Sequence, residues 1–198
     1  MKLGIFVAPD ATEPASTVDQ VLAADRSGLD LVGIQDHPYQ WRFLDTWTLL
    51  AYVAGRTERV RLVPDVVNLP LRPPAVLAKA AASLDVLSGG RVELGLGAGA
   101  FWEAIEGMGG PRRTPKQSVD ALEEAIAILR AFWSGERSVS FEGEHYRIRA
   151  CIRADRRSPL RGSGDVREAA RRGRGAARAR AAELTVLAYC GVASIPGG

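Results

Sequence analysis

The sequence lacks the features that mark membrane, metal-binding or disulfide-rich proteins. It has no run of about 18 apolar residues, so no transmembrane helix is expected. Its two cysteines, Cys151 and Cys190, form no CxxC pair and predict neither a disulfide framework nor a thiolate metal site. Its two histidines, His37 and His145, are far apart along the chain, so we expect no zinc centre and no metal site.

We expect no secretory signal at the amino terminus, because its short apolar stretch ends at Pro9 and Asp10. We therefore expect a cytoplasmic protein. The composition, 46% hydrophobic and 25% charged residues, is ordinary for a globular protein, and the length of 198 residues favours one domain.

Lysine is absent from residues 151–198, and this absence separates a tail from the rest. Residues 1–150 hold 16 Lys+Arg and 19 Asp+Glu, whereas the tail holds 10 Arg and 4 acidic residues. Its first strand-like run is Leu184–Ala188. An Arg/Ala/Gly bias without lysine is typical of GC-rich DNA translated in a shifted frame, so we expect a non-native tail at 151–198. A disordered or loosely helical extension is one alternative. A nucleic-acid-binding tail is another, disfavoured because no aromatics interleave the arginines.

Residues 1–150 alternate between short apolar runs and helical periodicity. The expected strands are Lys2–Ala8, Leu29–Gln35, Val60–Val67 (distorted at Pro64) and Arg91–Leu96. The expected helices run from Ser16 or Thr17 to Ser27, then Asp45–Gly55, Ala75–Leu87 and Gln117–Trp133. This order predicts an α/β protein with a parallel sheet, either a barrel or an open doubly wound sheet. Ser138–Arg149 then indicates a β-hairpin inserted after the fourth unit.

Polar side chains follow the second and third expected strands. In a parallel barrel the active site lies at the carboxyl ends of the strands. His37, held between Asp36 and Pro38, is placed to contact a cofactor ring or substrate, and Trp41 offers an aromatic wall. The alternative is a capping histidine with a packed tryptophan. Asn68 could donate to a ring carbonyl, although asparagine also suits a turn.

A glycine-rich run follows the fourth strand. Gly95, Gly97 and Ala100 fit a loose GxGxxA pattern, but a dinucleotide fingerprint should open a compact βαβ unit, and here no clear helix is expected before Gln117. We interpret Gly97 and Gly99 as letting a flat cofactor approach the backbone; the alternative is a tight strand exit. A Rossmann-type NAD enzyme is disfavoured.

Three motifs in residues 1–150 carry a resemblance to a known family. They are Asp36-His37-Pro38, Leu71–Lys79 (LRPPAVLAK) and Leu84–Gly99 (LDVLSGGRVELGLGAG). Together with the later FWSGE and FEGEHY segments, they resemble the luciferase-like monooxygenase family. The LDxLSGGRxxLGxGxG run is the most specific of them.

The resemblance implies a (β/α)₈ TIM barrel, usually dimeric, that binds FMN or the deazaflavin F420 and acts on a small molecule. It implies His37 as a catalytic residue. It also implies a cofactor pocket formed by Asp36, Trp41, Asn68, Gly97, Ala98 and Gly99. In the F420 branch a Glu often follows the glycines, whereas this chain has Ala100, so we expect FMN, with F420 as the alternative.

Only the first four of the eight β/α units of such a barrel are expected in residues 1–150, followed by the irregular tail. The sequence therefore predicts a truncated flavin-dependent oxidoreductase or monooxygenase. The alternative is a non-catalytic half-barrel that acts only by self-assembly.

Overall fold

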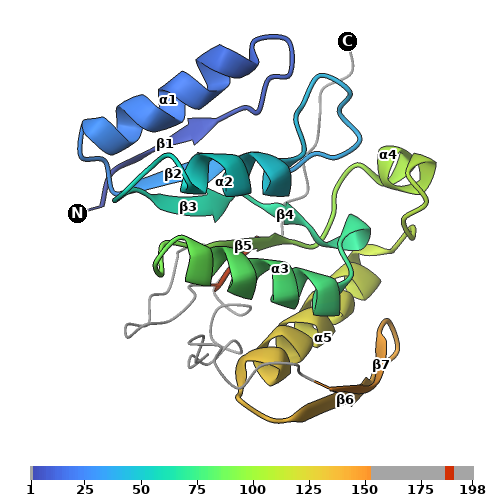
Figure 1. Ribbon diagram of the computed structural model, residues 1–198. Helices are drawn as coiled ribbons and strands as arrows, with labels where there is room; N and C mark the ends of the chain where they lie inside the picture. Colours follow the sequence, from blue (N-terminus) through green and yellow to red (C-terminus); the bar gives the residue numbers. More distant parts are fainter. Residues whose placement is uncertain (1, 153–185, 190–198) are drawn as a thin grey trace.

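Parallel strands, each followed by a helix, make up most of the computed structural model, which describes residues 2–152 and 186–189 (Figure 1). The strands are β1 (Gly4–Val7), β2 (Leu31–Ile34), β3 (Arg61–Pro64), β4 (Val67–Asn68), β5 (Leu94–Gly97), β6 (Ser138–Glu142), β7 (Arg147–Ile152) and β8 (Val186–Tyr189). The helices are α1 (Pro14–Arg26), α2 (Thr46–Ala54), the 3₁₀ turn η1 (Leu69–Leu71), α3 (Pro74–Leu87), α4 (Trp102–Gly107) and α5 (Pro115–Trp133). Most of the tail expected to be frame-shifted lies outside the described residues.

The strand order identifies a barrel. Strands β1, β2 and β3 pair in sequence order, and β4, β5 and β8 do the same, all in parallel. A bridge between Leu62 and Val92 joins the two groups. A doubly wound sheet would reverse its strand order at a switch point, and none occurs among these strands. The partial (β/α)₈ barrel expected from the sequence is confirmed, and the open doubly wound alternative is excluded.

Strands β3 and β4 form one barrel strand with an interruption. The chain leaves the sheet after Pro64, and Asp65 and Val66 intervene before pairing resumes at Val67. Proline cannot donate a ladder hydrogen bond, which is why a distortion was expected here.

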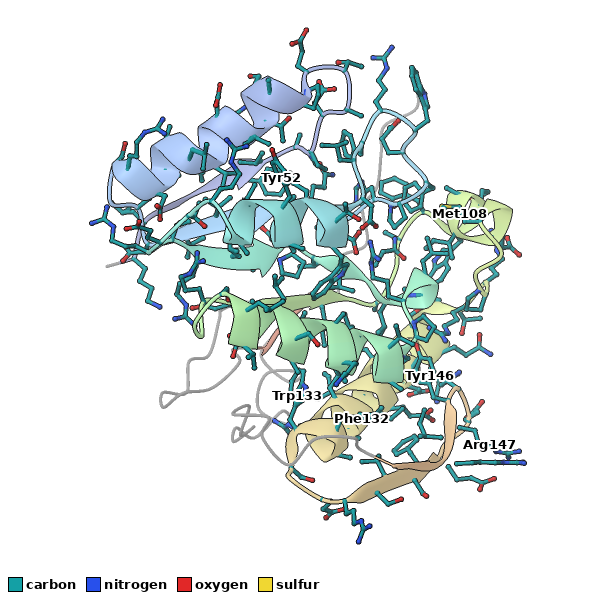
Figure 2. The ribbon with its side chains drawn as sticks, viewed as in Figure 1. Tyr52, Met108, Phe132, Trp133, Tyr146 and Arg147 are labelled. Carbon is teal, nitrogen blue, oxygen red and sulfur yellow. The ribbon has the colours of Figure 1, made fainter. Side chains whose placement is uncertain are left out.

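The helices form an outer layer in sequence order. Helix α1 packs on β1 and β2, α2 packs on β3, and α3 packs on α5. The helix-facing side chains of the strands, among them Val32, Ile34, Leu62, Leu94 and Leu96, are fully buried. Trp133, labelled in Figure 2, joins α5 to α3 by donating its indole N–H to the Ala78 carbonyl (3.2 Å).

Helix starts follow local chemistry. Helix α1 begins at Pro14, earlier than the expected start at Ser16 or Thr17, because proline is suited to the first helical position. Asp45, where a helix was expected to begin, caps α2 by accepting from the Thr48 backbone N–H (2.9 Å).

Two elements differ from the sequence expectation. Helix α4 fills a segment where no helix was expected before Gln117. Strand β8 falls on the strand-like run at Leu184–Ala188 and pairs with β5, so it adds one strand to the four units expected in 1–150. The hairpin β6–β7 is antiparallel, as predicted. Within the described ranges, no helix has the length and apolar character needed to cross a membrane.

Arg91 secures the amino ends of the strands. Its guanidinium donates to the carbonyls of Ala54 (2.8 Å), Val60 (3.1 Å) and Ser88 (2.7 Å) and to the Thr57 hydroxyl (2.8 Å). These partners come from the end of α2, the start of β3 and the end of α3. The SGGR motif therefore joins three elements at the face opposite the candidate site, and burial lowers the pKa of Arg91.

Candidate functional site

The expected site residues gather at the carboxyl ends of the barrel strands. Val7 of β1 is in register with Ile34 of β2, and Asn68 of β4 is in register with Gly97 of β5. Because all these strands are parallel, the segments that follow them emerge on one face. His37 lies three residues beyond the end of β2.

Asp36 is the buried anchor of this face. Its side chain is only 1% exposed and accepts two hydrogen bonds from the Arg72 guanidinium (2.7 and 2.8 Å) and one from the Asn68 backbone N–H (3.0 Å). Arg72 also pairs with Asp45 (2.8 Å), the cap of α2. Burial acts to lower the pKa of Arg72, but the carboxylates of Asp36 and Asp45 outweigh it and raise that pKa. Burial likewise acts to raise the pKa of Asp45, but hydrogen bonds from Arg72 and Thr48 lower it. The predicted cofactor residue Asp36 thus faces protein groups.

His37 is half-buried among aromatic rings. Tyr39 and Phe43 stack with it, with ring centroids 5.4 and 6.5 Å away, and Phe101 meets it edge-on at 5.6 Å. Its Nδ1 lies 3.0 Å from the Gln35 side-chain nitrogen. Burial lowers the pKa of His37 below its usual value although the Asp36 charge opposes this, so the ring is neutral at neutral pH.

Asn68 is buried beside Tyr39. Burial and the Asp36 charge raise the pKa of the Tyr39 hydroxyl to about 12, with the Asn68 amide acting in the opposite direction. In the part of the chain that the structure describes, Asn68 Oδ1 is buried without a hydrogen-bond partner. An unpartnered buried acceptor is costly, and such an atom is suited to accept an N–H from a bound molecule.

The glycines after β5 pack closely against protein atoms. A Cβ on Gly97 would lie 2.7 Å from Val66 Cγ2 and 3.2 Å from the Val67 carbonyl oxygen, and a Cβ on Gly99 would lie 2.7 Å from Pro70. Gly99 also has φ +102°, a conformation that favours glycine. Packing against protein atoms is therefore sufficient to require glycine at these two positions. This favours the tight strand exit, the alternative to close approach of a cofactor. Ala98 between them is buried.

Trp41 is not brought to this cluster. It is 77% exposed, with the Arg42 guanidinium 4.9 Å above its ring. The loop turns there because Ala11 and Leu44 pair with backbone atoms across the β1–α1 and β2–α2 connections, which places Phe43 under His37 instead.

Sequence reasoning missed Gln35, Arg72, Phe101 and Asp65. Arg72 lay within the recognised LRPPAVLAK motif, and Phe101 follows the glycine run, but nothing in their spacing named their partners. The Asp65 side chain lies over Gly33, close enough to contact a Cβ placed there, and burial raises the pKa of its carboxyl.

The arrangement combines a neutral imidazole, an unpartnered amide oxygen and several aromatic rings. This donor set suits a flat heterocycle with alternating N–H and C=O groups. It does not suit a metal ion, and no cluster of metal-ligating side chains occurs among residues 2–149.

Comparisons with known proteins identify the family. A family model described as luciferase-like monooxygenase matches residues 1–185, which extends past residue 150, where the resemblance seen in the sequence ends. The F420-dependent glucose-6-phosphate dehydrogenase of Kineococcus radiotolerans is 36% identical over 165 residues, 79% of this chain and 48% of the relative. The chain thus spans about half the length of the curated relatives it matches.

Solved structures show the same architecture. The oxygenating constituent of 3,6-diketocamphane monooxygenase, from the CAM plasmid of Pseudomonas putida and in complex with FMN, is 26% identical with a TM-score of 0.65. The match covers 75% of this chain and 43% of that one. The coenzyme F420 dependent tetrahydromethanopterin reductase from Methanopyrus kandleri, 24% identical, has a TM-score of 0.65 over 77% of this chain and 46% of its own. This second likeness concerns the fold alone.

Proposed function

Because the chain belongs to the luciferase-like monooxygenase family, we propose that it is a flavin-dependent oxidoreductase acting on a small molecule. The observation that carries this proposal is the buried, unpartnered Asn68 Oδ1 on the same face as the neutral His37. The pyrimidine edge of a flavin alternates carbonyl oxygens with N–H groups, so it needs both an acceptor and a donor from the protein.

When bound, the cofactor supplies the redox step, either hydride transfer or the activation of O₂. The residues of the chain bind the cofactor and the substrate, orient them and move protons. Asn68 Oδ1 would accept from a ring N–H, and His37, as the catalytic residue, would donate a hydrogen bond from its neutral ring or take part in proton transfer. Asp65, whose pKa burial raises, is a second group for proton transfer at this face.

The other expected cofactor residues take different roles in this proposal. Asp36 acts through Arg72 and the Asn68 backbone, holding the two strand exits together. Gly97, Ala98 and Gly99 would direct the chain after β5 so that it can lie beside the cofactor ring. Trp41 is exposed and would not contact the ring.

FMN and the deazaflavin F420 both carry a tricyclic ring system with the same pyrimidine edge. FMN is favoured by Ala100, where the F420 branch often has an acidic residue, and by the FMN complex of the Pseudomonas putida protein. F420 is favoured by the name of the Kineococcus radiotolerans relative, which is more similar to this chain. We propose FMN first and F420 as the alternative, and direct binding decides between them.

The test is to titrate the full chain with FMN and with F420 and to measure the dissociation constants from the quenching of fluorescence. We expect Asn68→Leu to weaken binding about tenfold, since one hydrogen bond to a buried group is lost. Asn68→Asp keeps an acceptor and should lose less. Glu123→Gln, on the exposed side of α5, is the control. Failure of the unaltered chain to bind either cofactor, with its fold intact, would contradict the proposal.

A second candidate function, self-assembly of a half-barrel without catalysis, is favoured by one observation. Phe6 in the middle of β1 is 57% exposed and shares its sheet face with Gly33.

We also propose a homodimer, supported by Tyr52 on α2 (labelled in Figure 2) and Val76 on the adjacent α3, which are 55% and 66% exposed. Sedimentation of Phe6→Ser and of Tyr52→Ser separates the two: self-assembly through the sheet face responds to the first variant, and a helix-face dimer responds to the second.

A further inference from the structure

The side chains of Gln35 and His37 are in hydrogen-bond contact. The Gln35 side-chain nitrogen lies 3.0 Å from His37 Nδ1. An amide nitrogen can only donate, so Nδ1 must accept, and the proton of the neutral ring is then on Nε2. We propose that Gln35 is a positioning residue that holds His37 in its Nε2–H form.

Gln35 is well placed for this role because its backbone is fixed on both sides. Its N–H donates to the Val7 carbonyl of β1 (3.2 Å), and its carbonyl accepts from the Thr46 hydroxyl at the start of α2 (2.5 Å). Thr46 is itself only 1% exposed. The side chain of Gln35 therefore starts from a rigid point at the end of β2.

The histidine ring is equally restricted. Tyr39 and Phe43 lie nearly parallel to it, with interplanar angles of 22° and 16°, and Phe101 closes one edge at 71°. Exchanging Nδ1 for Nε2 requires a half-turn of the ring between these neighbours. The order of the two nitrogens relative to Gln35 is thus set by packing, and the position of the proton is set by the Gln35 amide.

The charged and titratable groups around the ring are few. Asp36 precedes it and favours the imidazolium, but Arg72 neutralises that carboxylate. Tyr39 stays protonated because burial raises its pKa. Protonation of Nδ1 requires the Gln35 amide to turn and present its oxygen, so Gln35 also favours the neutral ring.

The consequence for chemistry rests on the proposed function: the Nε2–H of His37 is then the donor toward cofactor or substrate. The tautomer itself can be measured without any cofactor. The chain has two histidines, so long-range proton–nitrogen NMR of the full chain gives two imidazole patterns, and His145→Gln assigns them. His145 is the internal control in every variant below.

We expect the unaltered chain to show the Nε2–H pattern for His37. In Gln35→Glu a carboxylate replaces the donor, so the proton should move to Nδ1 and the pKa of His37 should rise by at least about one. Gln35→Met, which has similar volume and no donor, should leave a mixture of the two tautomers. His145 should be unchanged in both.

An Nδ1–H pattern in the unaltered chain would overturn the inference. So would an unchanged His37 tautomer and pKa in Gln35→Glu. If the tautomer behaves as expected but the chain binds neither FMN nor F420, the proposed function fails and the positioning role of Gln35 stands.

Discussion

At the amino ends of the strands Arg91 binds four neutral oxygens, whereas at the carboxyl ends Arg72 binds the carboxylates of Asp36 and Asp45. The first set of contacts is between a charge and dipoles, and the second is between opposite charges. Burial lowers the pKa of Arg91, while the carboxylates raise that of Arg72.

This difference separates stability from function along the same strands. In (β/α) barrels the amino ends of the strands serve stability and the carboxyl ends carry the chemistry. The SGGR part of the most specific motif lies at the stabilising end, and the glycines that close the same motif lie at the carboxyl end of β5. The charged contact of Arg72 instead holds the loop that presents His37, so it connects packing to the site.

The largest effect is expected at Arg72. Arg72→Met leaves the Asp36 carboxylate buried without its partner, which should lower the free energy of unfolding by about 3–5 kcal/mol. Urea denaturation measures this loss. Arg72→Lys keeps the charge but loses the bidentate contact, so it should lose less. Equal losses in the two variants would show that charge compensation of Asp36 is not the cause.

Arg91→Met should cost somewhat less, about 2–3 kcal/mol, because the acceptors it leaves are neutral. Urea denaturation again gives the value. We expect the folded fraction to keep its cofactor affinity, in contrast to Arg72→Met. A weaker cofactor affinity in folded Arg91→Met would contradict the assignment of stability to the amino ends of the strands and of function to their carboxyl ends.

Gly97→Ala should lower stability by about 1–3 kcal/mol, because the added Cβ meets Val66 Cγ2 and the Val67 carbonyl. Thermal unfolding measures the change. The double variant Val66→Ala/Gly97→Ala removes the closest atom and should recover part of the loss. If the single variant is as stable as the unaltered chain and only cofactor affinity falls, Gly97 serves cofactor approach and not packing.

The smallest effect is a pH dependence from His37. Its pKa is lowered in the folded chain, so the unfolded chain binds more protons between the two pKa values. Stability contributed by the neutral ring is therefore present above the ordinary value of 6.5 and is lost as the pH falls below it. Denaturation at about pH 7 and about pH 5 should show a smaller decrease in His37→Gln than in the unaltered chain. Identical decreases would contradict this assignment.

Much of the fold could be predicted from the sequence because its signals are local. Apolar runs of four to eight residues located the strands, and Asp45 and Pro64 indicated a helix start and a strand interruption. Helix α4 was missed because a six-residue helix has too few turns to show a periodicity. The start of α1 was misplaced because Ser16 and Thr17 suit a cap, but Pro14 suits the first turn better.

The site was predictable in position and not in detail. His37 and Asn68 follow predicted strands, so their common face could be derived. Arg72, the partner of Asp36, and Phe101, the partner of His37, come from segments farther along the chain, and only the folded barrel brings each pair together. Trp41 illustrates the limit: one turn in its loop decides whether Trp41 or Phe43 faces the histidine.

The pairing of β8 with β5 has a consequence for the order of assembly. Leu94 is in register with Val186, so about 90 residues must leave the ribosome before this ladder can close. Pairing of β1 with β2 and of β2 with β3 needs only about 30 residues each, and loop closure is less costly over that distance. During synthesis β5 therefore has an open edge long after β1–β3 can pair, and an unpaired strand edge is a site at which a nascent chain can associate with another.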